Sequence, residues 1–250
     1  MASPERIRFT LGGSLTPVVR VLLWVNGLVW LFLMLVKGRV YAPVGESYAD
    51  ILTELLGLSP KAVFHDWALW QPITYLFVHR EFWHLVLNML GLWWFGVDLE
   101  ATWGPKTFLR YYFFTGIGAG IVSALFGIPT IGASGAIYGV LLGYGMLFPN
   151  RVLYLYFVVP VKAKYCVLLF GVVELLAVVQ GGSGGVNNLA HVSGLVFGLI
   201  WFIFARRQLH LGELWRQLRK RRMRRRLQLI RKDQGEDAES PEPYDHPTIH

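Results

Sequence analysis

Residues 127–148 read GIPTIGASGAIYGVLLGYGMLF. The Gly/Pro/Thr stretch at the start breaks any helix, so we expect a continuous helix from about Ser134 to just before Pro149. Fifteen residues at about 1.5 Å each span roughly 22 Å, less than the ~30 Å hydrocarbon core of a bilayer. In a membrane such a helix begins below the outer surface. Because irregular backbone at that depth must line protein or a cavity, residues 127–133 are predicted to border a water-filled pocket.

The composition of the whole chain indicates a membrane-embedded protein. Of its 250 residues 54% are hydrophobic and 16% are charged, whereas a soluble chain carries roughly 25% charged residues. Residues 17–205 hold only 10 Lys/Arg and 8 Asp/Glu. This composition excludes a disordered chain and a collagen-like fibre, the single Cys166 excludes a disulfide scaffold, and the low charge argues against an ordinary cytosolic enzyme.

Apolar segments around the quoted stretch predict an all-α, polytopic membrane protein with six transmembrane helices around a water-filled cavity. The segments expected to cross are 16–36, 82–97, 107–126, 134–148, 165–180 and 189–205. The first has no small-residue cleavage site after it, so we expect a retained helix and no signal peptide. The intervening residues 38–80 are too polar to span and predict an interfacial helix near 48–58, with Trp67 and Trp70 as interface anchors. Residues 152–161 predict a short hairpin or a re-entrant piece.

The basic residues predict the orientation of the six helices. Four groups fall on one side of the predicted membrane: Arg6, Arg8 and Arg20; Lys106 and Arg110; Arg151, Lys162 and Lys164; and a dense run after the last helix. Cytoplasmic loops carry an excess of Lys and Arg, so both termini are predicted to be cytoplasmic. Four basic residues of the first loop oppose this bias, but five acids accompany them: Glu46, Asp50, Glu54, Asp66 and Glu81.

The charge pattern also divides the chain into four parts. Residues 1–15 form a cytoplasmic N-terminal segment, and 16–205 form the membrane domain. Residues 206–232 carry 12 of the 24 basic residues and one acid, which predicts contact with anionic lipid. Nucleic-acid binding is the disfavoured alternative, because no base-reading or stacking pattern accompanies the charge. Residues 233–250 hold six acids and no basic residue, and a disordered tail is expected there.

Ser134 stands at the start of the short helix in residues 127–148. Unpaired backbone N–H groups and the positive end of the helix dipole at this position can stabilise a developing oxyanion. The alternative is that Ser134 merely caps the helix, since serine is a preferred N-cap residue.

Small residues recur every four positions on two of the predicted helices. They are Gly135, Gly139 and Gly143 on the fourth helix, and Gly194 and Gly198 on the sixth. If these two glycine faces pack together, His191 comes close to Ser134. A histidine in a membrane helix is costly and marks a candidate functional site. Tyr138, one turn beyond Ser134, is expected to lie against the imidazole.

The second predicted helix carries another polar pair, His84 and Asn88. Their spacing of four places both side chains on one face of an otherwise apolar helix. We expect them to face a partner in the bundle interior. For His79, near the start of this helix, a structural hydrogen bond to loop backbone is the favoured interpretation.

With these motifs in place, the chain resembles the rhomboid intramembrane serine proteases of the bacterial six-helix type. The matching residues are Gly132, Ala133, Ser134, Gly135, Tyr138, Ala190, His191, Gly194, Gly198, His79, His84, Asn88, Glu100 and Gly104. The resemblance covers about 67–205. One departure is Trp70-Gln71, where the family often has Trp-Arg, and this puts the stability of the first loop in doubt.

The resemblance implies a mechanism and a site. Ser134 would be the nucleophile and His191 the general base of a dyad without a carboxylate. The oxyanion would be held by the Ser134 backbone N–H with His84 and Asn88, while Gly132 keeps the backbone near the nucleophile free of bulk. No metal or cofactor is implied. The implied substrates are membrane proteins cut within or next to a transmembrane helix, and the implied compartment is the bacterial inner membrane.

Some questions stay open on the sequence. Glu174 is the only acid between Ala101 and Gly212. A hydrogen bond to a neighbouring helix is favoured for it over proton relay or gating. The rival functions are a catalytically inactive relative that binds transmembrane clients and a small transporter or channel. The first is disfavoured because no predicted site residue is missing, and the second because neither paired pathway charges nor an inverted repeat is present.

Overall fold

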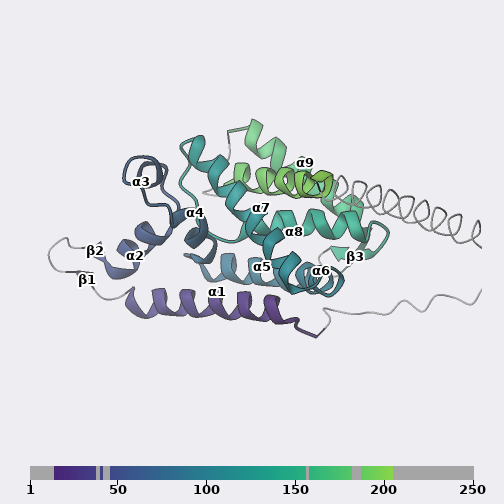
Figure 1. Ribbon diagram of the computed structural model, residues 1–250, viewed down its shortest axis with the longest axis horizontal. Coiled ribbons are helices and arrows are strands. Elements are labelled where there is room, and N and C mark those ends of the chain that lie inside the picture. The colour runs from purple at the N-terminus through teal and green to yellow at the C-terminus, as the bar shows by residue number, and fades with distance from the viewer. Residues whose placement is uncertain (1–13, 38–39, 42–45, 156–157, 182–186, 205–250) are drawn as a thin grey trace, which may run out of the picture. The chain divides into compact units, whose positions relative to one another are not determined.

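The computed structural model describes residues 14–37, 40–41, 46–155, 158–181 and 187–204 (Figure 1). The chain divides into two units, residues 1–201 and 202–250, and the second is described only for 202–204. The predicted basic segment 206–232 and acidic tail 233–250 therefore lie outside the described residues, as does nearly all of the N-terminal segment 1–15.

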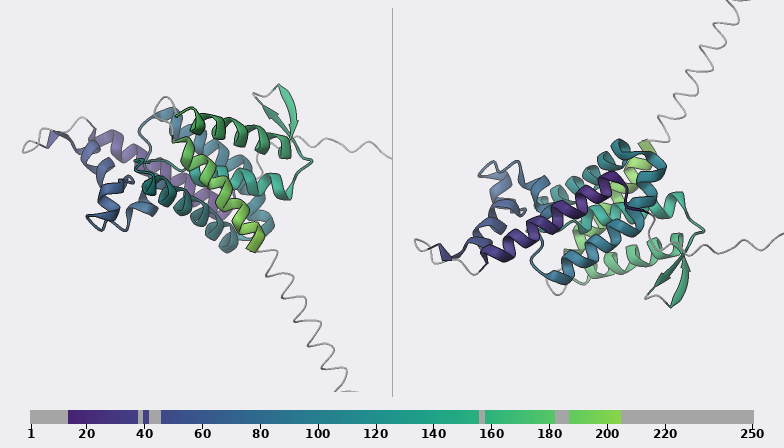
Figure 2. Two further views of the ribbon diagram at one scale, coloured as in Figure 1. Left: turned by 90° about the horizontal axis from the view of Figure 1, so that it is seen from above. Right: turned by 90° about the horizontal axis from the view of Figure 1, so that it is seen from below.

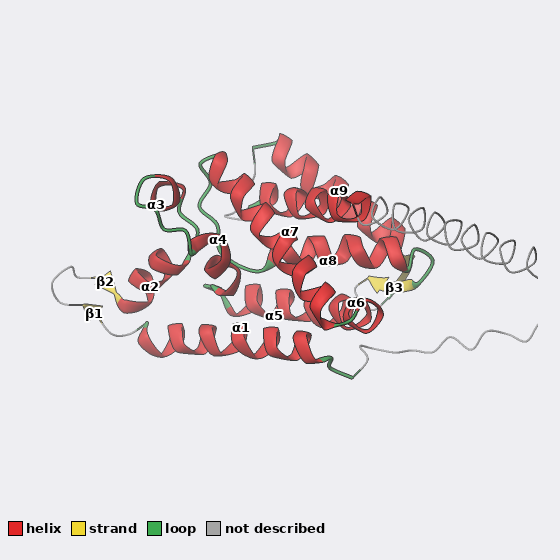
Figure 3. Cartoon of the chain, in the orientation of Figure 1, coloured by secondary structure: helices red, strands yellow, loops and turns green. Residues whose placement is uncertain are grey.

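Every apolar segment expected to be helical contains a helix (Figure 3). In and next to these segments lie α1 (Pro17–Val36), α5 (Phe82–Gly91), α6 (Val97–Trp103), α7 (Pro105–Leu125), α8 (Ser134–Leu147), α9 (Ala163–Val179) and a last helix, Asn188–Phe204. A π-helical stretch, Leu92–Gly96, joins α5 to α6 without a break, so the second predicted helix extends beyond its expected end at residue 97.

Among the described residues, two helices are both long and apolar enough to cross a membrane by length and composition. They are α1 and α7, while α8 and Asn188–Phe204 are apolar but shorter. Six crossings therefore stay a prediction. The short α8 is expected from the sequence, because the Gly/Pro/Thr stretch before it cannot be helical.

The region between α1 and α5 folds into short pieces. They are β1 (Val40–Tyr41), β2 (Glu46–Ser47), α2 (Tyr48–Leu56), α3 (Pro60–Phe64), α4 (Gln71–Thr74) and a 3-10 turn, Tyr75–Phe77. Helix α2 confirms the helix predicted near 48–58. The prediction of a hairpin at 152–161 is also confirmed, as β3 (Val152–Leu155) pairs antiparallel with β4 (Val159–Lys162). This hairpin projects from the bundle between α8 and α9 (Figure 2).

Gln71 stabilises the first loop in place of the arginine common in the resembled family. Its side chain is buried; its Oε1 accepts from the Ser59 N–H at 2.8 Å, and its Nε2 donates to the carbonyls of Glu54 at 3.0 Å and Leu55 at 3.2 Å. Trp70 Nε1 also donates to Leu55 O at 2.9 Å. One neutral amide thus joins the end of α2 to the start of α3.

Helices α7 and α8 pack through small residues and buried tyrosines. A Cβ on Gly139 would lie 2.5 Å from Thr115 Cβ, so the two backbones approach closely. Tyr111 Oη donates to Gly139 O at 2.5 Å, and Tyr75 Oη donates to Gly116 O at 2.6 Å. These bonds satisfy phenol groups that burial would otherwise leave unpaired. These contacts hold α8 against α7.

Candidate active site

The loop before α8 is held by hydrogen bonds from both sides. Thr130 pairs with Leu58 through backbone bonds of 2.9 Å in each direction, and Gly132 N–H donates to Tyr75 O at 2.8 Å. Ala133 N–H donates to His79 Nε2 at 3.3 Å. His79 is buried, so the structural hydrogen bond to loop backbone favoured for it is confirmed.

Ser134 lies at the first helical position of α8, with Ala133 as the N-cap residue and no side-chain cap bond. The alternative of Ser134 as a helix cap is therefore wrong. The Ser134 side chain instead contacts the last helix: its Oγ lies 2.7 Å from Nε2 of His191, which is buried. At the first helical position, the backbone N–H of Ser134 has no partner within its own helix.

Glycine contacts between α8 and Asn188–Phe204 create this approach, as the glycine spacing predicts. A Cβ on Gly194 would lie 2.0 Å from Gly135 O, so the two backbones touch there. At Gly198, one turn further, a Cβ would lie 3.5 Å from Gly139 Cα. His191 is three residues before Gly194 and therefore projects from the same face toward Ser134.

Tyr138 lies against the imidazole of His191. The two rings are stacked, with centroids 4.3 Å apart and planes 12° apart. The phenol of Tyr138 donates a hydrogen bond to Oε1 of Glu174 on α9. The stack restricts rotation of the imidazole, as the sequence led us to expect.

Glu174 is buried beside His191, which sequence reasoning did not foresee. Its Oε2 accepts from Asn188 Nδ2 at 2.7 Å, and its Oε1 lies 3.1 Å from His191 Nδ1. The latter contact is within ion-pair distance, but its alignment is not that of a hydrogen bond. The favoured expectation, a bond to a neighbouring helix, is confirmed. The lone acid in an apolar segment was the available signal, but spacing along the chain did not indicate which helix it would face.

Asn187 is a second residue that sequence reasoning missed. Its Nδ2 donates to Ser123 Oγ at 2.9 Å and Thr130 Oγ1 at 2.6 Å, and its Oδ1 accepts from Ala190 N–H at 3.1 Å. One side chain therefore caps the last helix and ties it to α7 and to the loop before Ser134. An Asn preceding an apolar helix was the signal in the sequence.

His84 and Asn88 lie on α5, and His84 packs against the loop before α8. A Cβ at Gly132 would lie 2.6 Å from the His84 Cε1 and Nε2 atoms, so the imidazole rests directly on this glycine. Asn88 is buried, and its Nδ2 donates to the carbonyl of His84 at 2.8 Å. This bond leaves the second amide hydrogen of Asn88 for another partner. Their role toward an oxyanion stays a prediction.

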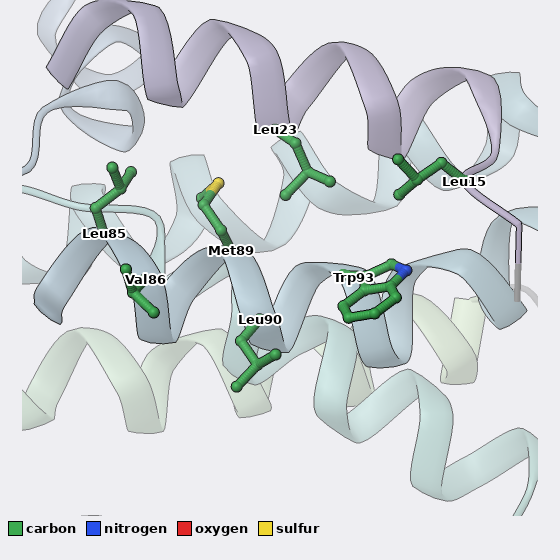
Figure 4. Close-up of a pocket in the computed structure, with 7 residues that line it drawn as sticks. All are labelled: Leu15, Leu23, Leu85, Val86, Met89, Leu90 and Trp93. Atoms are coloured by element: carbon green, nitrogen blue, oxygen red, sulfur yellow. The ribbon is translucent and has the colours of Figure 1, made fainter. Parts of the chain in front are cut away.

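A pocket lies between α1 and α5, apart from these residues (Figure 4). It is lined by Leu15, Leu23, Leu85, Val86, Met89, Leu90 and Trp93. The lining is apolar and offers little hydrogen-bonding capacity, so it does not form part of the candidate active site.

The family model of the Rhomboid domain matches residues 66–208, more than half of the chain. The chain belongs to the rhomboid family. It is therefore a membrane-embedded protein, and the described part of the chain is mostly helical.

Named members of the rhomboid family share about a third of the aligned residues. Rhomboid protein 1, mitochondrial, of Saccharomyces cerevisiae is 35% identical over 51% of this chain and 40% of its own length. Rhomboid-like protein 11, chloroplastic, of Arabidopsis thaliana is 29% identical over 71% of this chain and 65% of its own length. Rhomboid-like protease 3 of Toxoplasma gondii is 30% identical over 48% of each chain. The chain thus spans less than two thirds of the length of these relatives.

Proposed function

We propose that this rhomboid protein is a serine endopeptidase that cleaves membrane proteins within or next to a transmembrane helix. The observation that carries the proposal is the 2.7 Å contact between Ser134 Oγ and His191 Nε2. A nucleophile and a base within hydrogen-bond reach, with the base held by a third group, are typical of covalent hydrolytic catalysis. Here the third group is Tyr138, whose ring stacks on the face of the His191 imidazole and holds it in place.

In the proposed reaction Ser134 Oγ attacks the scissile carbonyl carbon while His191 Nε2 takes the hydroxyl proton. His191 then gives this proton to the leaving amine, and an acyl-enzyme ester forms on Ser134. Water attacks the ester in the second half, with His191 again as the base, and the serine is regenerated. The proton and the electron pairs balance without a metal or a cofactor.

The oxyanion of each tetrahedral intermediate needs donors aimed at it. We assign this role to the Ser134 backbone N–H, the His84 imidazole and the free amide hydrogen of Asn88. Gly132 supports the assignment, because its lack of a side chain lets His84 lie against the loop. Gly135, Gly194 and Gly198 would act indirectly, by keeping α8 and the last helix in contact.

We further propose six membrane crossings with both termini in the cytoplasm. The six helical segments and the positions of the basic residues support this topology. The substrates would be transmembrane proteins, and the basic segment 206–232 would bind anionic lipid. The resemblance implies a bacterial inner membrane, but the named relatives do not support this location. The name of one relative includes the word mitochondrial, and that of another the word chloroplastic.

Cleavage of a model transmembrane substrate in liposomes tests the proposal. The wild type should release product, whereas Ser134→Ala and His191→Ala should not. Asn88→Ala should be slower than wild type by about 100- to 1,000-fold, the usual cost of losing one oxyanion donor, and faster than Ser134→Ala. Equal product from wild type and Ser134→Ala would contradict the proposal. Absence of product from the wild type would favour the inactive relative that binds clients.

A further inference from the structure

The buried Nδ1 atom of His191 faces a carboxylate. Oε1 of Glu174 lies 3.1 Å from it, and both side chains are only 10% exposed. Nδ1 has no aligned hydrogen-bond partner, although it is sealed from solvent. A buried polar atom left in this way is costly, and such atoms in native structures often mark a catalytic role.

Glu174 itself is fixed on both of its oxygens. Tyr138 donates to Oε1 from α8, and Asn188 donates to Oε2 from the start of the last helix. These two donors come from the same helices that carry Ser134 and His191. The carboxylate position is therefore set by the site and not by the exposed apolar residues of α9.

We propose that Glu174 is a positioning residue that completes a Ser134–His191–Glu174 triad. This inference rests on the proposed function. The carboxylate favours the imidazole tautomer with its proton on Nδ1, which leaves the Nε2 lone pair facing the Ser134 hydroxyl. When Nε2 takes the serine proton, the Nδ1–H of the resulting imidazolium faces an anion at ion-pair distance. The proton later leaves from Nε2 to the amine, and Glu174 stays unprotonated throughout.

Two other roles for Glu174 make different predictions. A purely structural tie between α9 and its neighbours would affect the stability of the fold. A gating role for α9 would affect the entry of a transmembrane substrate and hence KM. A positioning role would lower kcat, because the imidazolium forms only during the chemical step.

The test compares Glu174→Gln with wild type in liposomes, measuring kcat and KM for the transmembrane substrate. A second readout is the rate at which a small fluorophosphonate labels Ser134, in which an Oγ–P bond forms, fluoride leaves and His191 takes the proton. This probe needs activation of the serine but no entry of a transmembrane helix. All rates are divided by the folded fraction of each preparation.

Three variants provide the comparison. Asp98→Asn is the matched carboxylate-to-amide control, in a partly exposed ion pair with Arg151, and should keep the wild-type rates. Asn188→Ala removes one of the two donors to Glu174 but keeps the carboxylate itself and its bond from Tyr138, so the contact with Nδ1 is expected to remain. Glu174→Asp keeps the charge and should recover part of the rate lost in Glu174→Gln. If Glu174→Gln does not fold, the rates of Glu174→Asp are compared with those of the wild type instead.

We expect Glu174→Gln to lower both kcat and labelling by at least about tenfold with KM unchanged, within the range that positioned acid–base groups contribute. A wild-type kcat and labelling rate in Glu174→Gln would overturn the inference and leave the proposed function intact. Losses no greater than in Asn188→Ala, or a change confined to KM, would overturn it as well. Failure of the proposed function has a different signature, namely equal product from wild type and Ser134→Ala.

Discussion

Gly132 occupies a backbone conformation that other residues rarely adopt, with φ of +98°. A Cβ there would also lie 2.6 Å from two ring atoms of His84. Gly132→Ala should therefore strain the loop by about 1–2 kcal/mol and push the imidazole away from its position on the loop. We expect a lower melting temperature in detergent and slower cleavage, by up to about 100-fold if His84 is an oxyanion donor.

Gly27→Ala is the control for this substitution. Gly27 lies in α1 with open space around the position of an added Cβ. The melting temperature and cleavage rate of Gly27→Ala should stay at or slightly above those of the wild type, because alanine favours a helix such as α1 more than glycine does. Wild-type cleavage by Gly132→Ala would contradict the assignment of His84.

A hydrogen-bond network links the start of α1 to α6. The buried carboxylate of Glu100 accepts from Val18 N–H at 2.9 Å, from Val19 N–H at 2.9 Å and from the hydroxyl of Thr16. These N–H groups have no partner within α1, and an anion at this end also complements the helix dipole. Glu100 and Val18 are 82 positions apart in the sequence, so this contact appears only in three dimensions.

We expect Glu100→Ala to destabilise the protein by several kcal/mol, since hydrogen bonds to a charged group contribute about 1.5–3 kcal/mol each. Thermal unfolding in detergent measures the effect. Asp98→Asn, two residues away, should change the melting temperature little, because an exposed ion pair contributes only about 0–1 kcal/mol. Equal shifts in the two variants would contradict the capping role of Glu100.

The contact between α8 and the last helix allows no added atom at Gly194. A Cβ there would lie 2.0 Å from the carbonyl oxygen of Gly135, which is backbone and cannot rotate away. Gly194→Ala should force the helices apart and lengthen the Ser134–His191 contact. We expect a lower melting temperature and at least a tenfold loss of cleavage, because small misplacements of reacting groups are costly.

Gly171→Ala is the matched control on α9. Its added Cβ would meet Leu195 Cδ1 at 3.4 Å, an ordinary van der Waals contact. Its cleavage rate should remain near that of the wild type. If Gly194→Ala cleaves equally well, the close glycine contact is not what positions His191.

Across the whole molecule, the proposed topology predicts that both termini lie on one side of the membrane. An even number of crossings requires this, and the Lys/Arg distribution predicts that the side is the cytoplasm. Reporter fusions at residue 1 and residue 250 should thus give the same cytoplasmic readout. A fusion within the first loop, 38–47, should give the opposite one. Opposite signals from the two termini would exclude six crossings.

Local pattern was sufficient for much of the architecture. Apolar length located the helices, the Gly/Pro/Thr stretch located the start of α8, and glycine spacing predicted the face on which Ser134 meets His191. These features depend on interactions between residues close in the sequence or on the regular four-residue spacing of small residues. The continuation of α5 through a π-helical stretch into α6 was not predicted. It depends on how the helices pack, whereas the predicted end of the helix was placed where the apolar segment ends.

The sequence by itself determined a helical membrane protein with a serine at a helix start and a histidine on a glycine face, because hydrophobic length and residue periodicity are encoded locally. Only the tertiary structure decided the partners of the isolated polar side chains. Gln71 holds the first loop, Glu100 caps α1, and Glu174 faces Nδ1 of His191. Such pairings join residues 12 to 82 positions apart, and they depend on how the helices pack, which no spacing along one helix reveals.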